Sequence, residues 1–144
     1  MGDPRSDALR FTIVIPMKNM AAYVGQTVDS ILAQGYDDLE VLAIDDGSTD
    51  GSLEVVAGRS DPRVKAIRNP GKGWPDAFNH GVEIATGEYV SKCDADDLYP
   101  AGRVEPQASY LREFPQADAV SGYMSFMTSD GRDVVVLDEY PPGP

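Results

Sequence analysis

Short strand-like runs alternate with helical patterns along this chain, and this alternation limits its possible folds more than any other feature. Four strands are predicted by FTIVIP (11–16), LEVLAID (39–45), RVKAIRN (63–69) and GEYVSKCD (87–94). The second run lacks polar alternation, as expected for a strand that is covered on both faces. A fifth strand is expected around 118–127.

Helical periodicity fills the segments between these strands. One amphipathic stripe, with apolar residues at i, i+4, i+7 and i+8, consists of Val24, Val28, Ile31 and Leu32. Residues 52–58 and 103–114 predict two further helices. Pro75 suits the first turn of another helix, whose buried face we expect to comprise Phe78, Val82 and Ala85. The alternation predicts an α/β fold, a mostly parallel sheet with helices on both faces.

Length and charge restrict the class of protein. A chain of 144 residues suggests one domain, expected over 11–137, with a flexible N-terminus at 1–10 and a proline-rich tail at 138–144. Its 12 basic and 24 acidic residues give a net charge of -12, which argues against nucleic acid as a partner and suits a protein that binds divalent cations. Apolar runs are only strand-sized and no signal-peptide core is present, so we expect no membrane segment and a cytoplasmic location.

Carboxylates crowd the end of the fourth predicted strand, in the sequence KCDADDLYP (92–100). Asp94, Asp96 and Asp97 repel one another unless a cation or water screens them. A metal ion and a solvated acidic turn both explain such a cluster. Because residues two apart share a face in an extended segment, Asp94 and Asp96 are expected to point the same way. Two hard oxygen ligands suit Mg²⁺ or Mn²⁺, whose other positions are left for water and phosphate.

Polar residues follow three of the predicted strands. They are Pro16 to Asn19 after the first strand, Asp45 and Asp46 after the second, and Asp94 to Asp96 after the fourth. Ligands of open α/β sheets bind outside the carboxyl ends of the strands, so these residues should gather at one edge. A divalent ion there would neutralise the charge on a departing diphosphate. Neither G-x-x-x-x-G-K-[ST] nor G-x-G-x-x-G is present, which argues against an ATPase and a dinucleotide-dependent dehydrogenase.

Two long stretches resemble the family-2 glycosyltransferases. FTIVIPMKNMAAYVGQTVDSILAQGYDDLEVLAIDDGSTDGS is similar to the opening of these enzymes, and NPGKGWPDAFNHGVEIATGEYVSKCDADDLYP is similar to their middle section, with its Asp-x-Asp motif. The resemblance covers residues 10–127 and implies the nucleotide-sugar-binding half of the glycosyltransferase A fold, a Rossmann-like sheet. It also implies Mn²⁺ or Mg²⁺, a nucleoside-diphosphate sugar as donor, and an acceptor hydroxyl on a glycan, lipid or protein.

Carried over residue by residue, the resemblance implies a nucleoside pocket along the edge of the sheet. Pro16 and Asn19 would line this pocket, and Asp46 or its neighbour Asp45 would contact the base. Asn79 matches an asparagine that supports the site from a helix.

The resemblance also implies a metal site and shows two departures. Asp94 would contact the ribose or the metal, and Asp96 would be the principal metal ligand. Lys18 stands where the family often has an aromatic residue, and a lysine there would approach a phosphate. Phe78 stands where an arginine is common, which removes a positive contact.

A catalytic base is expected outside this sequence. Inverting members of the family use a carboxylate from a later segment, which we expect beyond Pro144, and the only late acidic pair is Asp138 and Glu139 in the proline-rich tail. We therefore expect a fragment without the base and without the acceptor-binding half. Two alternatives are an inactive nucleotide-binding module and a phospho-receiver domain. A receiver needs an acidic pair after the first strand, where this chain has PMKN.

Overall fold

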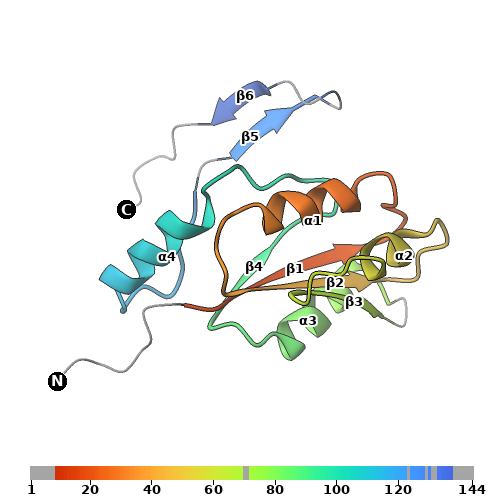
Figure 1. Ribbon diagram of the computed structural model, residues 1–144, viewed down its shortest axis with the longest axis horizontal. Coiled ribbons are helices and arrows are strands. Elements are labelled where there is room, and N and C mark those ends of the chain that lie inside the picture. The colour runs from red at the N-terminus through yellow and green to blue at the C-terminus, as the bar shows by residue number, and fades with distance from the viewer. Residues whose placement is uncertain (1–8, 70–71, 123, 129, 131–132, 138–144) are drawn as a thin grey trace.

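The structure is a computed structural model that describes residues 9–69, 72–122, 124–128, 130 and 133–137. Its elements, in chain order, are β1 (Phe11–Met17), α1 (Val24–Leu32), β2 (Leu39–Asp45), α2 (Ser52–Ala57), β3 (Val64–Arg68), α3 (Trp74–Ile84), β4 (Tyr89–Lys92), α4 (Val104–Glu113), β5 (Met124–Met127) and β6 (Asp133–Leu137). The main sheet has the order β3-β2-β1-β4, and all its pairings are parallel (Figure 1).

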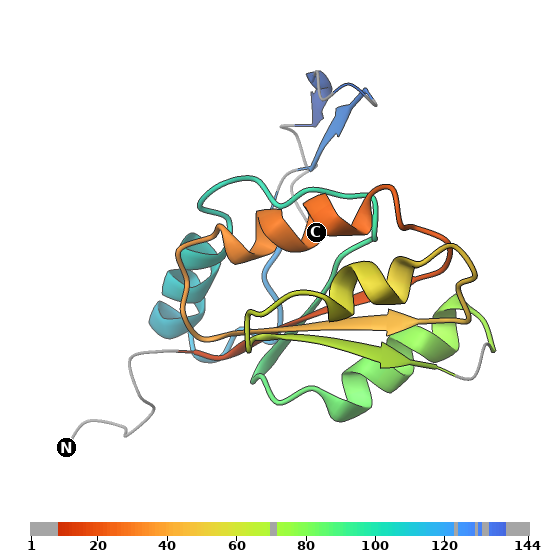
Figure 2. The same ribbon diagram turned by 45° about the vertical axis from the view of Figure 1, so that its right-hand side comes forward.

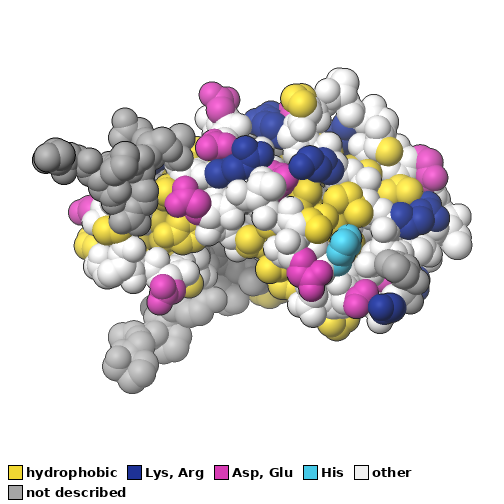
Figure 3. All heavy atoms as spheres, turned by 90° about the horizontal axis from the view of Figure 1, so that it is seen from below, with side chains coloured by type: hydrophobic (Ala, Val, Ile, Leu, Met, Phe, Trp, Pro, Cys, Tyr) yellow, Lys and Arg dark blue, Asp and Glu magenta, His cyan; other side chains and the backbone are white. Residues whose placement is uncertain are grey.

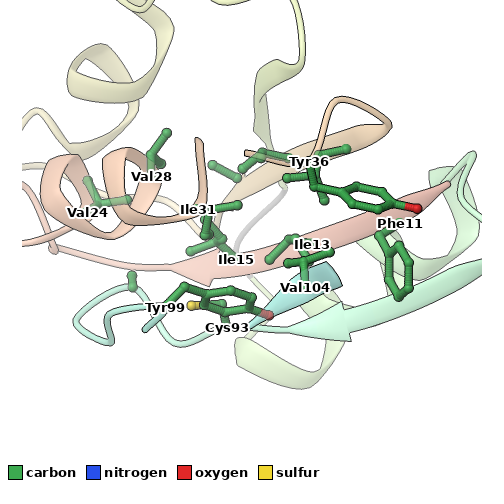
Figure 4. Packing of buried hydrophobic residues seen from close by; sticks show 14 of the residues in the cluster. Phe11, Ile13, Ile15, Val24, Val28, Ile31, Tyr36, Cys93, Tyr99 and Val104 are labelled. Carbon is green, nitrogen blue, oxygen red and sulfur yellow. The ribbon is translucent and has the colours of Figure 1, made fainter. Parts of the chain in front are cut away.

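Helices cover both faces of this sheet, so the predicted α/β class is confirmed. Helix α3 lies on one face, and α1 and α2 lie on the other (Figure 2). The larger core joins α1, α4 and the sheet through Ile13, Ile15, Val24, Val28, Ile31, Val104 and other buried side chains (Figure 4). The smaller core lies under α3 and consists of Val14, Leu42, Ile44 and Ala77. Alternate residues of β1 therefore pack into different layers.

The buried face of α3 agrees with the prediction only in part, because Phe78 and Ala85 are partly buried against the smaller core whereas Val82 is not. Val82 was expected to be buried but is 41% exposed, and the fully buried residues of this helix are Ala77 and Gly81. A Cβ atom on Gly81 would lie 2.3 Å from Cγ1 of Val14 and 3.2 Å from Cγ1 of Ile44. The helix therefore contacts the sheet through its small residues, a pattern that a search for large apolar side chains misses.

A buried carboxylate ties three segments together near the amino ends of the strands. Glu40 of β2 accepts hydrogen bonds from the Thr12 hydroxyl at 2.8 Å and from Lys65 Nζ at 2.8 Å. It also accepts bonds from the backbone N–H of Thr86 at 2.8 Å and from its hydroxyl at 2.9 Å. Burial raises the pKa of Glu40, but the bonds from Lys65, Thr86 and Thr12 outweigh it and lower this pKa to about 2. The ionised carboxylate of Glu40 therefore stabilises the folded state.

The C-terminal part of the chain differs from the predicted fifth strand at 118–127. Residues 118–122 form no strand, and β5 pairs with β6 in a separate antiparallel hairpin (Figure 1). Strand β6 was not predicted. Residues 1–8 and 138–144 lie outside the described part of the chain, so the predicted domain limits remain predictions. Within the described residues, every helix is too short or too polar to cross a lipid bilayer.

Candidate functional site

The loops that follow β1 and β2 are bonded to each other at the carboxyl edge of the sheet. The side-chain oxygen of Asn19 accepts a hydrogen bond from the backbone N–H of Thr49 at 2.9 Å, and the N–H of Asn19 donates to Ser48 Oγ at 2.9 Å. The N–H of Met20 donates to Ser52 Oγ at 2.7 Å. Asn19 has a φ of 54°, in the left-handed region that asparagine tolerates better than most residues. This residue, predicted to line a nucleoside pocket, therefore also fixes the shape of the edge.

Asp46 anchors the segment that leads into α3. This residue is 4% exposed, and its carboxylate accepts hydrogen bonds from the backbone N–H of Gly73 at 3.1 and 3.2 Å and from Asn69 Nδ2 at 3.2 Å. The neighbouring Asp45 is fully buried and accepts the N–H of Ser48 at 3.2 Å. The expected contact between Asp46 and a base remains a prediction, and the structure adds a positioning role for this carboxylate.

The acidic cluster lies on a turn directly after β4. Strand β4 ends at Lys92, and the N–H of Asp97 donates to the carbonyl of Asp94 at 3.1 Å. The extended geometry that was expected through Asp96 is therefore wrong, because the chain turns there. Asp96 is exposed and has no hydrogen bond or ion pair with another described residue, whereas Asp94 is paired with Lys92. Burial, followed by the charges of Asp94 and Asp96, raises the pKa of Asp97.

A polar stripe on and after α1 holds this acidic turn in place. The residues at i, i+3 and i+7 of the stripe are Thr27, Ser30 and Gln34. The Thr27 hydroxyl donates to the carbonyl of Ala95 at 2.8 Å, inside the Asp-Ala-Asp sequence. Ser30 Oγ accepts the N–H of Tyr99 at 3.0 Å. These residues were not predicted from the sequence, although polar residues at helical spacing beside an apolar stripe are a usable signal, and the structure buries Thr27 and Gln34.

Gln34 also caps α4 from a distance. Its Oε1 accepts the backbone N–H groups of Arg103 at 2.8 Å and Val104 at 3.3 Å, and its Nε2 donates to the carbonyl of Pro100 at 2.9 Å. The first N–H groups of a helix have no partner within the helix, so this single amide satisfies two of them.

Replacing Gln34 with leucine is expected to lower the free energy of unfolding by about 1–3 kcal/mol, because the buried N–H of Val104 loses its acceptor and that of Arg103 keeps only the carbonyl of Pro100 at 3.3 Å. Urea unfolding of the purified chain measures this change. The matched control is Gln26→Leu, an exposed position of α1, for which we expect a change within about 0.5 kcal/mol. Equal effects of the two variants would contradict the capping role.

A lysine and an aromatic pair lie beside the acidic turn. Lys92 Nζ lies 2.8 Å from Asp94 Oδ1 and 2.9 Å from Asp94 Oδ2, and 4.9 Å from the ring centroid of Trp74. Trp74, the first residue of α3, is 45% exposed and stacks on Phe78 with ring centroids 5.8 Å apart. No role for Lys92 was predicted from the sequence. The end of β4 and the start of α3 thus meet through this cation.

Most of the predicted site residues meet at the carboxyl edge of the sheet. Strands β1 and β2 end in register at Met17 and Asp45, and the acidic turn follows the neighbouring β4. Pro16 is buried within β1, and Lys18 is exposed directly after it.

Asn79 lies on the flank of α3, beside Asn69, which donates to Asp46. It borders a surface depression of about 270 Å³ with Asn69, Lys72, Asp76, His80 and Glu83. This face of the molecule also exposes hydrophobic side chains beside the single histidine (Figure 3). A larger groove of about 440 Å³ runs between β4 and α4, and none of the predicted site residues lines it.

The chemistry of the acidic turn fits a divalent cation of the hard, oxygen-binding type. Asp96 presents an exposed carboxylate without a described partner, and Asp94 is only part-buried. Within the described residues, no three His, Cys, Asp or Glu side chains are grouped closely enough to hold an ion. An ion at the turn would therefore take its other ligands from water and from a bound phosphate, as Mg²⁺ commonly does.

Comparisons with known proteins agree with the fold. Glycosyltransferase GlyG of Streptococcus pneumoniae serotype 4 (strain ATCC BAA-334 / TIGR4) is 35% identical over 124 residues, which cover 83% of this chain and 41% of that protein. An uncharacterized glycosyltransferase, alr2836 of Nostoc sp. (strain PCC 7120 / SAG 25.82 / UTEX 2576), is 30% identical over 139 residues, covering 94% of this chain and 42% of that protein. This chain thus spans less than half the length of either relative.

Two solved structures show the same fold. The mannosyltransferase PcManGT from Pyrobaculum calidifontis, in complex with GDP-Man and Mn²⁺, superposes with a TM-score of 0.64 at 30% identity, covering 78% of this chain and 34% of that one. S. aureus TarS 1-349 in complex with UDP-GlcNAc gives a TM-score of 0.65 at 26% identity, covering 73% of this chain and 32% of that one. Residues 12–140 match the family described as Glycosyl transferase family 2, and the chain belongs to that family.

Proposed function

We propose that this chain forms the donor site of a metal-dependent glycosyltransferase, which transfers a sugar from a nucleoside diphosphate to an acceptor hydroxyl. One observation carries the proposal: the loops after β1, β2 and β4 meet at one edge, where the turn after β4 presents the free carboxylate of Asp96. The similar structures that contain GDP-Man with Mn²⁺ and UDP-GlcNAc support a nucleotide sugar as the ligand class.

The nucleoside would lie along the loops after β1 and β2. Pro16 and Asn19 would form one wall, and the bonds of Asn19 to the β2–α2 loop keep that wall fixed before ligand arrives. Asp46 would accept a hydrogen bond from the base while it holds Gly73. Asn79 would support the site indirectly, through the flank of α3.

The diphosphate would lie between the acidic turn and Lys18. Asp96 would be the principal ligand of Mn²⁺ or Mg²⁺, and Asp94 would contact the ion or the ribose. Lys18 is exposed at the end of β1 and would approach a phosphate. When bound, the divalent ion supplies charge neutralisation for the departing diphosphate. The family resemblance implies inversion by a single displacement, and the proposal assigns the catalytic base to none of the described residues.

Calorimetric titration of the chain with UDP, GDP, dTDP and CDP, each with Mn²⁺ and with EDTA, tests this function. We expect one of these nucleotides to bind in Mn²⁺ and to lose at least about tenfold in affinity in EDTA, because Asp94 and Asp96 would hold the ion, which would supply positive charge for the diphosphate. Equal affinity in EDTA would contradict the metal dependence. An absence of binding by all four nucleotides would contradict the donor site in this chain.

A further inference from the structure

Lys92 is placed to act on the acidic turn in a way that the proposed donor site does not include. Its ammonium contacts both carboxylate oxygens of Asp94, at 2.8 and 2.9 Å, and lies 4.9 Å from the ring centroid of Trp74. The partner strand explains this direction, because Lys92 pairs with Val14, whose side chain packs under α3. The backbone of β4 therefore directs the lysine towards α3, between the aromatic ring and the carboxylate.

We propose that Lys92 is the resident counter-ion of Asp94, that a divalent cation competes with it for this carboxylate, and that Lys92 thereby lowers the metal affinity of the site. The inference rests on the proposed function, in the form in which Asp94 is a metal ligand. Both oxygens of Asp94 are engaged by one ammonium, so an ion that binds either oxygen competes with a positive charge that already lies within 3 Å of it. Asp96 has no such partner among the described residues and stays open to the ion.

Two effects oppose the ion while Lys92 is in place. The first is the loss of the ion pair between Lys92 and Asp94. This loss costs little, because both side chains are partly exposed. The second is repulsion between the ammonium and a doubly charged ion a few ångströms away. Removing the charge of Lys92 should therefore tighten metal binding by about three- to tenfold. Trp74 is the only tryptophan of the chain, so its fluorescence reports whether the ammonium leaves the ring.

The experiment uses the 144-residue chain and the metal alone. Mn²⁺ affinity is measured by electron paramagnetic resonance for the wild type, Lys92→Met, Lys92→Arg and Arg10→Met. Arg10→Met is the matched control, because it removes the same charge at the opposite, amino end of the parallel strands, where Arg10 directly precedes β1. Mg²⁺, which is not paramagnetic, is then titrated while Trp74 emission is recorded.

We expect Lys92→Met to bind Mn²⁺ about three- to tenfold more tightly, with Lys92→Arg close to the wild type and Arg10→Met within about twofold of it. Mg²⁺ should change the Trp74 emission of the wild type and leave that of Lys92→Met nearly constant. If the wild type and Lys92→Met bind Mn²⁺ equally, or if Mg²⁺ leaves the wild-type emission unchanged, the inference is overturned while the metal site stands. If neither protein binds Mn²⁺ at millimolar concentrations, the proposed metal site fails and the inference fails with it.

Discussion

Replacing Glu40 with alanine is expected to lower the free energy of unfolding by about 3 kcal/mol at neutral pH. Four hydrogen bonds, from Thr12, Lys65 and Thr86, lose their common acceptor in this variant. The Thr12 hydroxyl is fully buried and cannot replace the lost acceptor with water. A domain of this size is typically stable by only about 5–15 kcal/mol, so the loss is a large fraction of the total.

The same carboxylate predicts a pH dependence of stability. Because the folded-state pKa of Glu40 is about 2 and lies below that of an unfolded glutamate, its contribution is fully present above about pH 5. That contribution is lost as the pH falls from about 5 towards 2, where Glu40 becomes protonated in the folded state as well. The difference in stability between wild type and Glu40→Ala should therefore narrow across this interval.

Urea unfolding of both proteins between pH 7 and pH 2.5 measures the two effects together. Glu113→Ala is the control, because Glu113 is an exposed carboxylate at the end of α4 and should change stability by less than about 0.5 kcal/mol. A difference between wild type and Glu40→Ala that stays constant with pH would mean that the carboxylate acts by packing and not by its charge.

The strands that are marked by continuous apolar runs were predicted from the sequence. Strands β1 and β2 were expected at nearly their observed bounds, because a buried parallel strand needs an uninterrupted apolar run. The position of the acidic turn at the carboxyl edge of the sheet was predicted from the alternation of strands and helices alone, since parallel strands bring their carboxyl ends together. Membership of glycosyl transferase family 2 also removes the phospho-receiver alternative.

The missed features depend on partners that are distant in the sequence. Gln34 caps a helix 70 residues later, and Glu40 is bonded to Thr86, 46 residues away. Contacts between residues so far apart in the chain produce no periodic pattern in the sequence. The buried face of α3 was predicted only in part: Val82 is exposed, and close packing on the sheet selects Ala77 and Gly81, which a hydrophobicity pattern ignores. The role of Lys92 follows from the direction in which β4 points its side chain, and this requires the sheet register.

Replacing Asp96 with asparagine is expected to weaken Mn²⁺-dependent nucleotide binding by about 100-fold or more while the fold is kept. Asparagine retains one oxygen but loses the negative charge, and ligand charge is a main determinant of affinity for hard cations. Mutating residues that only support a metal ligand already lowers metal affinity by about 10- to 100-fold. Because Asp96 is exposed and makes no described hydrogen bond or ion pair, the free energy of unfolding, measured by thermal denaturation, should change by no more than about 0.5 kcal/mol.

Asp97→Asn is the matched control for this variant, since it removes the same charge one residue further along the turn. The N–H of Asp97 closes the turn on the carbonyl of Asp94, a bond that asparagine preserves. Its carboxylate has a raised pKa, because burial and then its two acidic neighbours disfavour the charged form. We expect Asp97→Asn to change nucleotide affinity by less than about fivefold. Comparable losses in the two variants would show that the acidic turn attracts the ion by its total charge, and that Asp96 does not ligate it.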